Sequence, residues 1–178
     1  MANENKMSKQ NNANEYLKIR EKFAEVFSEE RLKSTLDFVD YLEESGRLCE
    51  FNPDDPCICF DYMGEYSGLF LYEKNEDITM SIWFLLCWRN NCDVSEHENF
   101  PVDENLKEFA QKNIHKCTEC GGCRSYGFGP TSRIIFGKEF DNVCNDVFHF
   151  YSPEGDELKN VIRLMELQKH IIADNKRP

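Results

Sequence analysis

Residues 78–88 have the sequence Ile-Thr-Met-Ser-Ile-Trp-Phe-Leu-Leu-Cys-Trp, and this stretch decides the expected fold. Side chains at every second position share one face of a strand, so the stretch has two distinct faces. The second face is mixed and includes Trp83, so it is either a partly covered sheet face, the commoner arrangement, or the lining of a ligand pocket. The fully apolar face is expected to pack on helices, and consists of Ile78, Met80, Ile82, Phe84, Leu86 and Trp88.

Four other stretches have the composition of strands, because they are rich in β-branched and aromatic residues and are separated by turns. The first two precede residues 78–88 and are expected to form an antiparallel meander with them. The expected additional strands are residues 57–62, 66–73, 131–136 and 143–151, with residues 137–142 connecting the last two.

Apolar residues at helical spacing predict four helices. The first covers residues 14–27, the second follows Ser28, the third covers about 103–114, and the last follows Ser152. Ser28 and Ser152 are typical N-cap residues, Gly46 is a typical C-cap, and Pro153 suits the first position of a helix.

This order of elements predicts an α+β fold, with an antiparallel sheet of about five strands, helices mainly on one face and a Cys-rich metal-binding loop. The length of 178 residues suits a single domain, placed at residues 14–175. Residues 1–13 are polar and rich in Asn, Lys and Gln, so they are predicted to be a disordered lead-in.

The formal net charge of −12 argues against nucleic acid and anionic membranes as partners, because both require a positive surface. No run approaches the roughly 18 apolar residues of a membrane helix, and the polar first residues are not those expected of a secretory signal. Aromatic residues make up 13% of the chain, which favours thick apolar packing or a pocket. We therefore expect a cytoplasmic protein whose partner is a cationic or amphipathic small molecule or another protein.

The sequence Cys117-Thr118-Glu119-Cys120-Gly121-Gly122-Cys123 brings three thiols together. In a reducing compartment such a cluster is more typical of metal binding than of disulfides. Zinc takes four ligands in tetrahedral geometry, and two cysteines separated by two residues can bind one ion from a tight loop. The predicted structural zinc site consists of Cys117, Cys120, Cys123 and Cys144, with His115 as the alternative fourth ligand.

Two alternatives to zinc fit the same spacing, namely an iron–sulfur cluster and redox-active thiols. A ferredoxin-type run ends in Cys-Pro, whereas Asn145 follows Cys144. Positive side chains beside the loop would stabilise thiolates in each case, and these are Lys112, His115, Lys116 and Arg124.

The remaining cysteines and histidines are interpreted as structural. Cys57 and Cys59 share one face of a strand and are expected to lie in the core as small apolar residues. The same is expected of Cys49 and Cys87, and His149 and His170 are treated as isolated histidines. A second metal half-site at Cys92 and His97 is the less favoured alternative.

No nucleophile elbow, phosphate-binding glycine loop or His-Glu-x-x-His motif occurs in the sequence. The 33 acidic residues make pairs of carboxylates common by chance. We therefore assign no catalytic residue and favour a protein that is not an enzyme.

The segment Arg133-Ile-Ile-Phe-Gly-Lys-Glu-Phe-Asp-Asn-Val-Cys144, with the cysteine loop before it and a helix after it, resembles the C-terminal part of an uncharacterised family of small bacterial cytosolic proteins. The order of elements also resembles the GyrI-like effector-binding domains. That second resemblance implies a pocket with aromatic and carboxylate groups for cationic or amphipathic molecules. Those domains have no such cysteine loop, so no site residue is transferred. The favoured hypothesis is a zinc-binding regulatory module, and the alternative is a redox-responsive or iron–sulfur protein.

Overall fold

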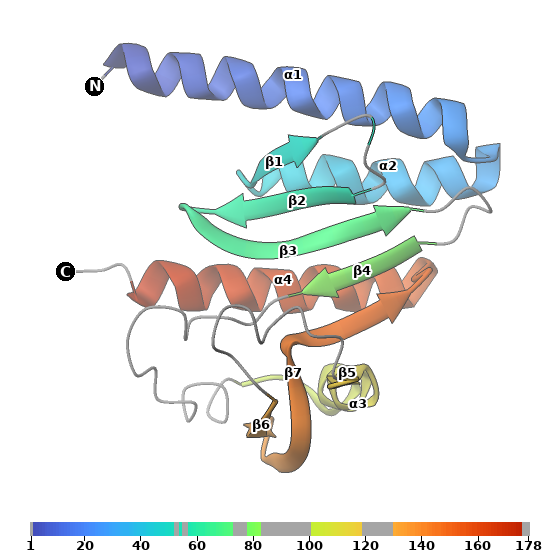
Figure 1. The fold of residues 1–178 in the computed structure, drawn as a ribbon, viewed down its shortest axis with the longest axis vertical. Helices are drawn as coiled ribbons and strands as arrows, with labels where there is room; N and C mark the ends of the chain where they lie inside the picture. Colours follow the sequence, from blue (N-terminus) through green and yellow to red (C-terminus); the bar gives the residue numbers. More distant parts are fainter. Residues whose placement is uncertain are drawn as a thin grey trace.

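The computed structural model describes residues 2–51, 54, 57–72, 78–82, 101–118 and 130–175. The fold is α+β, as predicted (Figure 1). Within the described residues the helices are α1 (Ala2–Val26), α2 (Glu29–Glu44), α3 (Glu104–Lys112) and α4 (Gly155–Asn175). The strands are β1 (Leu48–Phe51), β2 (Cys57–Tyr62), β3 (Glu65–Tyr72), β4 (Ile78–Ile82), β5 (Ile114–Lys116), β6 (Thr131–Ile135) and β7 (Lys138–Tyr151).

All strand pairings are antiparallel. The strand order is β1-β2-β3-β4-β7-β5, and β6 also pairs with β7. β2 has the predicted bounds, and β3 begins one residue earlier than predicted. The sequence does not predict β1 and β5, because four and three residues are too few to show an alternating pattern. The second half of the predicted strand at residues 78–88, including Trp83, lies outside the described residues.

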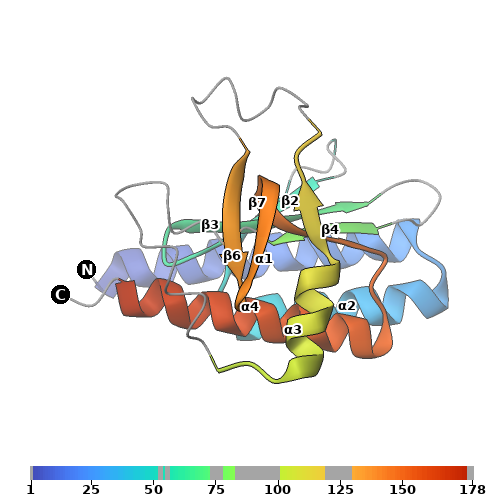
Figure 2. The same ribbon diagram turned by 90° about the horizontal axis from the view of Figure 1, so that it is seen from below.

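The core lies between the sheet and the helices. Helices α2 and α4 cover one face of β2, β3 and β4, and α1 runs beside β1 (Figures 1 and 2). The Phe70 ring of β3 lies 5.3 Å from Phe23 of α1 and 5.9 Å from Phe38 of α2. All three side chains are at most 1% exposed, and burying each contributes about 1.5–3 kcal/mol. This face of the sheet therefore determines how the helices pack.

Helix α2 begins after Ser28 as the sequence predicts, and its C-cap is Ser45, one residue before the predicted Gly46. Ser28 has the extended conformation of an N-cap, and its carbonyl oxygen accepts the first helical hydrogen bond from Leu32 N at 2.7 Å. Gly46 follows the C-cap with a φ of +76°, a conformation that costs glycine little.

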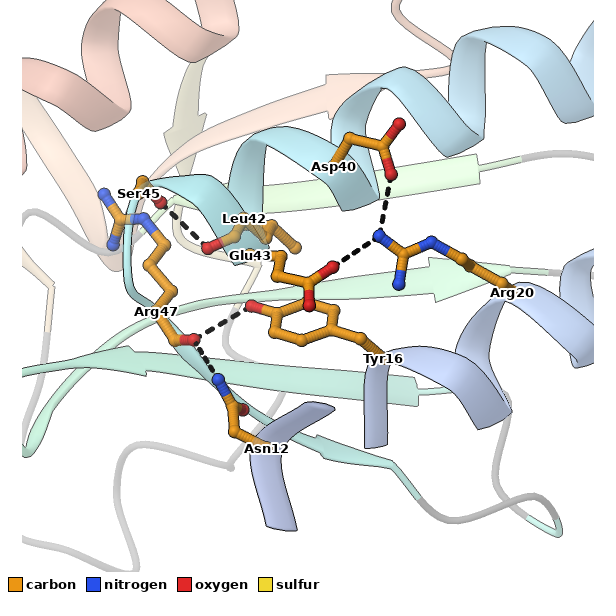
Figure 3. A network of polar contacts seen from close by, with 8 residues as sticks. All are labelled: Asn12, Tyr16, Arg20, Asp40, Leu42, Glu43, Ser45 and Arg47. Atoms are coloured by element: carbon orange, nitrogen blue, oxygen red, sulfur yellow. Dashed lines mark hydrogen bonds and ion pairs between the residues drawn. The ribbon is translucent and has the colours of Figure 1, made fainter. Parts of the chain in front are cut away.

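Helix α1 continues through the region for which the sequence predicts a disordered lead-in. Asn12 shows what attaches this helix to the sheet (Figure 3). Its side-chain nitrogen donates to Arg47 O at 3.0 Å, and its side-chain oxygen accepts from Cys49 N at 3.2 Å. The Tyr16 hydroxyl donates to the same Arg47 oxygen at 2.9 Å. Composition alone does not reveal these contacts, because their partners lie more than thirty residues away.

The Arg47 side chain is fully buried between β2 and α4. Its guanidinium donates to Met165 O at 2.7 Å and to Gln168 Oε1 at 3.1 Å. The same group lies 5.9 Å from the ring centre of Phe60 and 5.7 Å from that of Tyr62. Neutral acceptors and aromatic rings thus hold this cation in the core.

A tight turn joins β6 and β7 in place of the predicted connection at residues 137–142. Phe136 and Gly137 both have positive φ angles, of 49° and 77°, as in a type I′ hairpin turn. The Gln111 side chain donates to the carbonyl oxygens of Ile135 and Phe136 at 3.1 and 3.3 Å. β7 therefore begins at Lys138 and is much longer than the predicted strand.

Ser152 ends β7 and does not cap α4, so the predicted start of the last helix is wrong. Its nitrogen donates to Ile78 O at 2.7 Å, and its hydroxyl oxygen accepts from Ile78 N at 3.1 Å. These bonds extend the pairing of β4 with β7, and α4 begins three residues later at Gly155.

Candidate functional site

The predicted metal loop connects two strands that flank the same residue of β7. β5 and β6 lie on opposite edges of the first half of β7, and Lys116 and Thr131 both pair with Val143. The end of β5, the start of β6 and the bent middle of β7 project beyond β2–β4 on the side opposite α2 and α4 (Figure 2). A loop that starts after Lys116 and returns at Thr131 therefore begins and ends beside Val143.

Cys117 lies at the first of these loop ends. Its nitrogen donates to Asn142 O at 2.8 Å, and the Asn142 side-chain nitrogen donates back to Cys117 O at 3.2 Å. The Cys117 side chain is half-buried. This pair of bonds fixes the backbone of Cys117 against β7.

Cys144 follows Val143 directly and is 5% exposed. Val143 belongs to the hydrophobic core, and Cys144 lies outside that cluster of packed side chains. The pairing of β5 with β7 is interrupted between Ile114 and Lys116, so β7 is irregular near Cys144. The register therefore brings Cys144 next to the start of the cysteine loop, and its role as a metal ligand stays a prediction.

The other predicted ligands, Cys120 and Cys123, lie outside the described residues, as do the pocket residue Trp83 and the half-site Cys92 and His97. In the part of the chain that the structure describes, no three His, Cys, Asp or Glu side chains are arranged to hold a metal ion. The four-cysteine site therefore stays a prediction.

A stacked histidine pair lies next to the loop, and the sequence gives little sign of it. The rings of His115 on β5 and His149 on β7 are 3.6 Å apart between centres and 27° from parallel. The backbone nitrogen of His149 donates to Asn113 O at 3.1 Å, which holds the two strands together here. Tyr151 meets His149 edge-on at 6.5 Å and is 72% exposed. His115 was expected as an alternative zinc ligand, and His149 as an isolated histidine.

Cys57 and Cys59 do not lie in the core, contrary to the expectation for small apolar residues. The residues that alternate with them, Ile58 and Phe60, are 2% and 1% exposed and pack under the helices. The two cysteines are half-buried on the opposite face of β2. By contrast, Cys49 is buried as expected, and burial raises the pKa of its thiol to about 12.

Comparisons with family models, curated proteins and solved structures found no match for this chain. The two family resemblances therefore stay predictions. Among the described helices, none combines the length and the apolar character needed to cross a membrane.

Proposed function

We propose that this protein is a cytosolic zinc-binding module that is not an enzyme, with a structural zinc ion at Cys117, Cys120, Cys123 and Cys144. One observation carries the proposal: the register of β5, β6 and β7 places Cys117 and Cys144 at the base of the segment that contains the other two cysteines. Two cysteines on paired backbone at the base of a Gly-containing loop that carries two more would supply the four ligands that a tetrahedral zinc site takes.

A zinc ion at this place would tie the end of β5 and the start of β6 to the middle of β7. β5 is three residues long, and its pairing with β7 is interrupted. Binding free energy at a structural zinc site becomes folding free energy, because the unfolded chain does not preform the site. The ion would therefore hold β5 and β6 against β7 and fix the strand that carries His115.

The proposed working surface is the sheet face that α2 and α4 leave uncovered. It carries Tyr151, 72% exposed, and Tyr66 and Leu71, each 37% exposed. The net charge of −12 favours a cationic or amphipathic ligand, or a basic partner, over an anionic one. The protein would then bind such a ligand in a regulatory role, with zinc as a structural element.

The decisive experiment is elemental analysis with a visible spectrum on protein purified anaerobically without added metal. We expect about one zinc per chain and no visible colour, with loss of the zinc in Cys117→Ser and Cys144→Ser. Cys49→Ala removes a buried thiol elsewhere and should keep the metal. His115→Ala tests the alternative ligand, since it would lose zinc only if His115 replaces Cys144.

Two outcomes would overturn the proposal. Full zinc content in both Cys117→Ser and Cys144→Ser would mean that these residues are not ligands. Iron and a broad visible band in the wild-type protein would instead establish the iron–sulfur alternative.

A further inference from the structure

Cys57 and Cys59 bring two sulfur atoms together on the sheet face opposite α2 and α4. Residues two apart on a strand point to the same side, and here the two Sγ atoms are 3.9 Å apart. Both side chains are half-buried, so an ion from solvent can reach the sulfurs.

The surroundings of this pair are apolar on the β3 side, and on the β1 side Glu50 pairs in register with Cys59. Leu71 and Leu69 of β3 pair in register with Cys57 and Cys59. The Tyr66 hydroxyl lies 3.8 Å from Cys59 Sγ and is the donor in that contact. An O–H donor stabilises a thiolate, and the neighbouring leucines limit access of water.

The geometry suits a bridging ion better than a disulfide. Residues two apart on a strand have Cα atoms about 6.5–6.8 Å apart, at the upper limit for a disulfide, and the sulfurs would have to close to about 2.05 Å. In contrast, an ion that lies about 2.3 Å from each sulfur would have a sulfur–ion–sulfur angle of about 116° at the present separation of the two atoms. That angle is close to the trigonal value of about 120° and far from the roughly 180° of a two-coordinate copper ion, so the pair suits two positions of a three-coordinate site.

We propose that Cys57 and Cys59 supply two sulfur ligands of a three-coordinate site for monovalent copper, with a neutral small molecule from solvent in the third position. Thiolates select soft ions, and monovalent copper is stable with two or three sulfur ligands, whereas a structural zinc site takes four ligands. Binding would form two copper–sulfur bonds and release the two thiol protons to solvent, giving a complex with one net negative charge. No electron transfer is involved.

This site does not depend on the proposed zinc centre. β3 and β4 lie between β2 and β7 in the sheet. Cys57 and Cys59 of β2 are therefore remote from Cys144 of β7 and from Cys117, which lies against β7. The two metals can be measured separately on the same protein. Failure of one proposal therefore leaves the other standing.

The test is an anaerobic titration of the full-length, zinc-loaded protein with monovalent copper, in competition with the chromogenic chelator bathocuproine disulfonate. We expect one tightly bound copper ion per chain. Cys57→Ser and Cys59→Ser should each weaken this binding by about 100-fold or more, since each leaves a single ligand of the chelate. Tyr66→Phe should weaken it less, and zinc content should not change in any of these variants.

Cys49→Ala is the matched control, because Cys49 lies on the neighbouring strand but is buried on the other face. It should bind copper as the wild type does. The proposal would be wrong if the variant lacking both Cys57 and Cys59 bound the same copper with the same affinity, or if copper bound only by displacing zinc. Phenylarsine oxide, which bridges paired thiols, gives a second measurement: it should protect Cys59 from alkylation in the wild type but not in Cys57→Ser.

Discussion

The two faces of the central strands place different demands on the sequence. On the face under the helices, Ile58 and Phe60 of β2 and Phe70 of β3 are at most 2% exposed and pack in one continuous core. On the other face, the same strands carry Cys57, Cys59 and the partly exposed Leu71. The comparison shows that close packing restricts the first face to apolar residues of matching size. The second face is less restricted by packing and can carry residues that bind a ligand.

Large-to-small substitutions should separate the two faces most strongly. Phe60→Ala should destabilise the protein by about 3–5 kcal/mol, because it leaves a cavity between α2 and the sheet and removes a ring from beside Arg47. Leu71→Ala, on the uncovered face, should cost less than about 1 kcal/mol. Urea unfolding of both variants measures the difference. Equal losses would mean that the uncovered face is packed as tightly as the other.

Alkaline pH should reveal the titration of the buried Cys49 thiol. Burial raises the pKa of Cys49 from 9.0 to about 12, so above pH 9 the unfolded chain loses this proton before the folded protein does. The contribution of this thiol to the free energy of unfolding should therefore be fully present below pH 9. It should be lost as pH rises toward 12, and the loss is at most about 4 kcal/mol. Melting temperatures of Cys49→Ala should fall less steeply over this range. Leu71→Ala, which removes no titratable group, should follow the wild type, and a flattened profile in that variant would contradict this assignment.

The smallest effect concerns ligand binding on the uncovered face. Tetraphenylphosphonium, an aromatic cation, should bind more tightly than neutral triphenylphosphine oxide because of the acidic surface. Tyr151→Ala should weaken its binding about two- to fivefold through loss of a cation–π contact. Leu17→Ala removes an exposed apolar group from α1 and should have no effect. Equal binding of the cation and the neutral compound in calorimetry would argue against a cation-binding face.

The elements that the sequence predicts well are those whose signals are local. The bounds of β2 follow from its alternation and flanking turns, and those of α2 follow from Ser28 and Gly46. The prediction that Ser152 caps α4 is wrong because its hydroxyl oxygen accepts a hydrogen bond from Ile78 N of β4. A serine hydroxyl engaged in this way is not available as an N-cap. The sequence also does not predict the hairpin turn at Phe136. The positive φ of this buried aromatic residue is stabilised by hydrogen bonds from Gln111, which belongs to α3.

The candidate sites were predictable only in part. The sequence predicts that strand pairing could bring Cys144 back to the cysteine loop. In the structure Lys116 pairs with Val143, and Cys117 N donates to Asn142 O, so Cys144 lies near Cys117. The stacked pair of His115 and His149 depends on β5, which is too short to recognise. Cys57 and Cys59 alternate with core residues, and sequence alternation alone does not say which face lies under the helices.

The contacts of Asn12 have a consequence for how the molecule behaves among its copies. β1 lies at the end of the strand order, where unsatisfied backbone groups can recruit a strand from another chain. The Asn12 carboxamide donates to Arg47 O and accepts from Cys49 N at this edge of the sheet. An added strand would make the same kind of bonds to these backbone groups. A single side chain on α1 thus closes part of the sheet to β-augmentation and to aggregation through that strand.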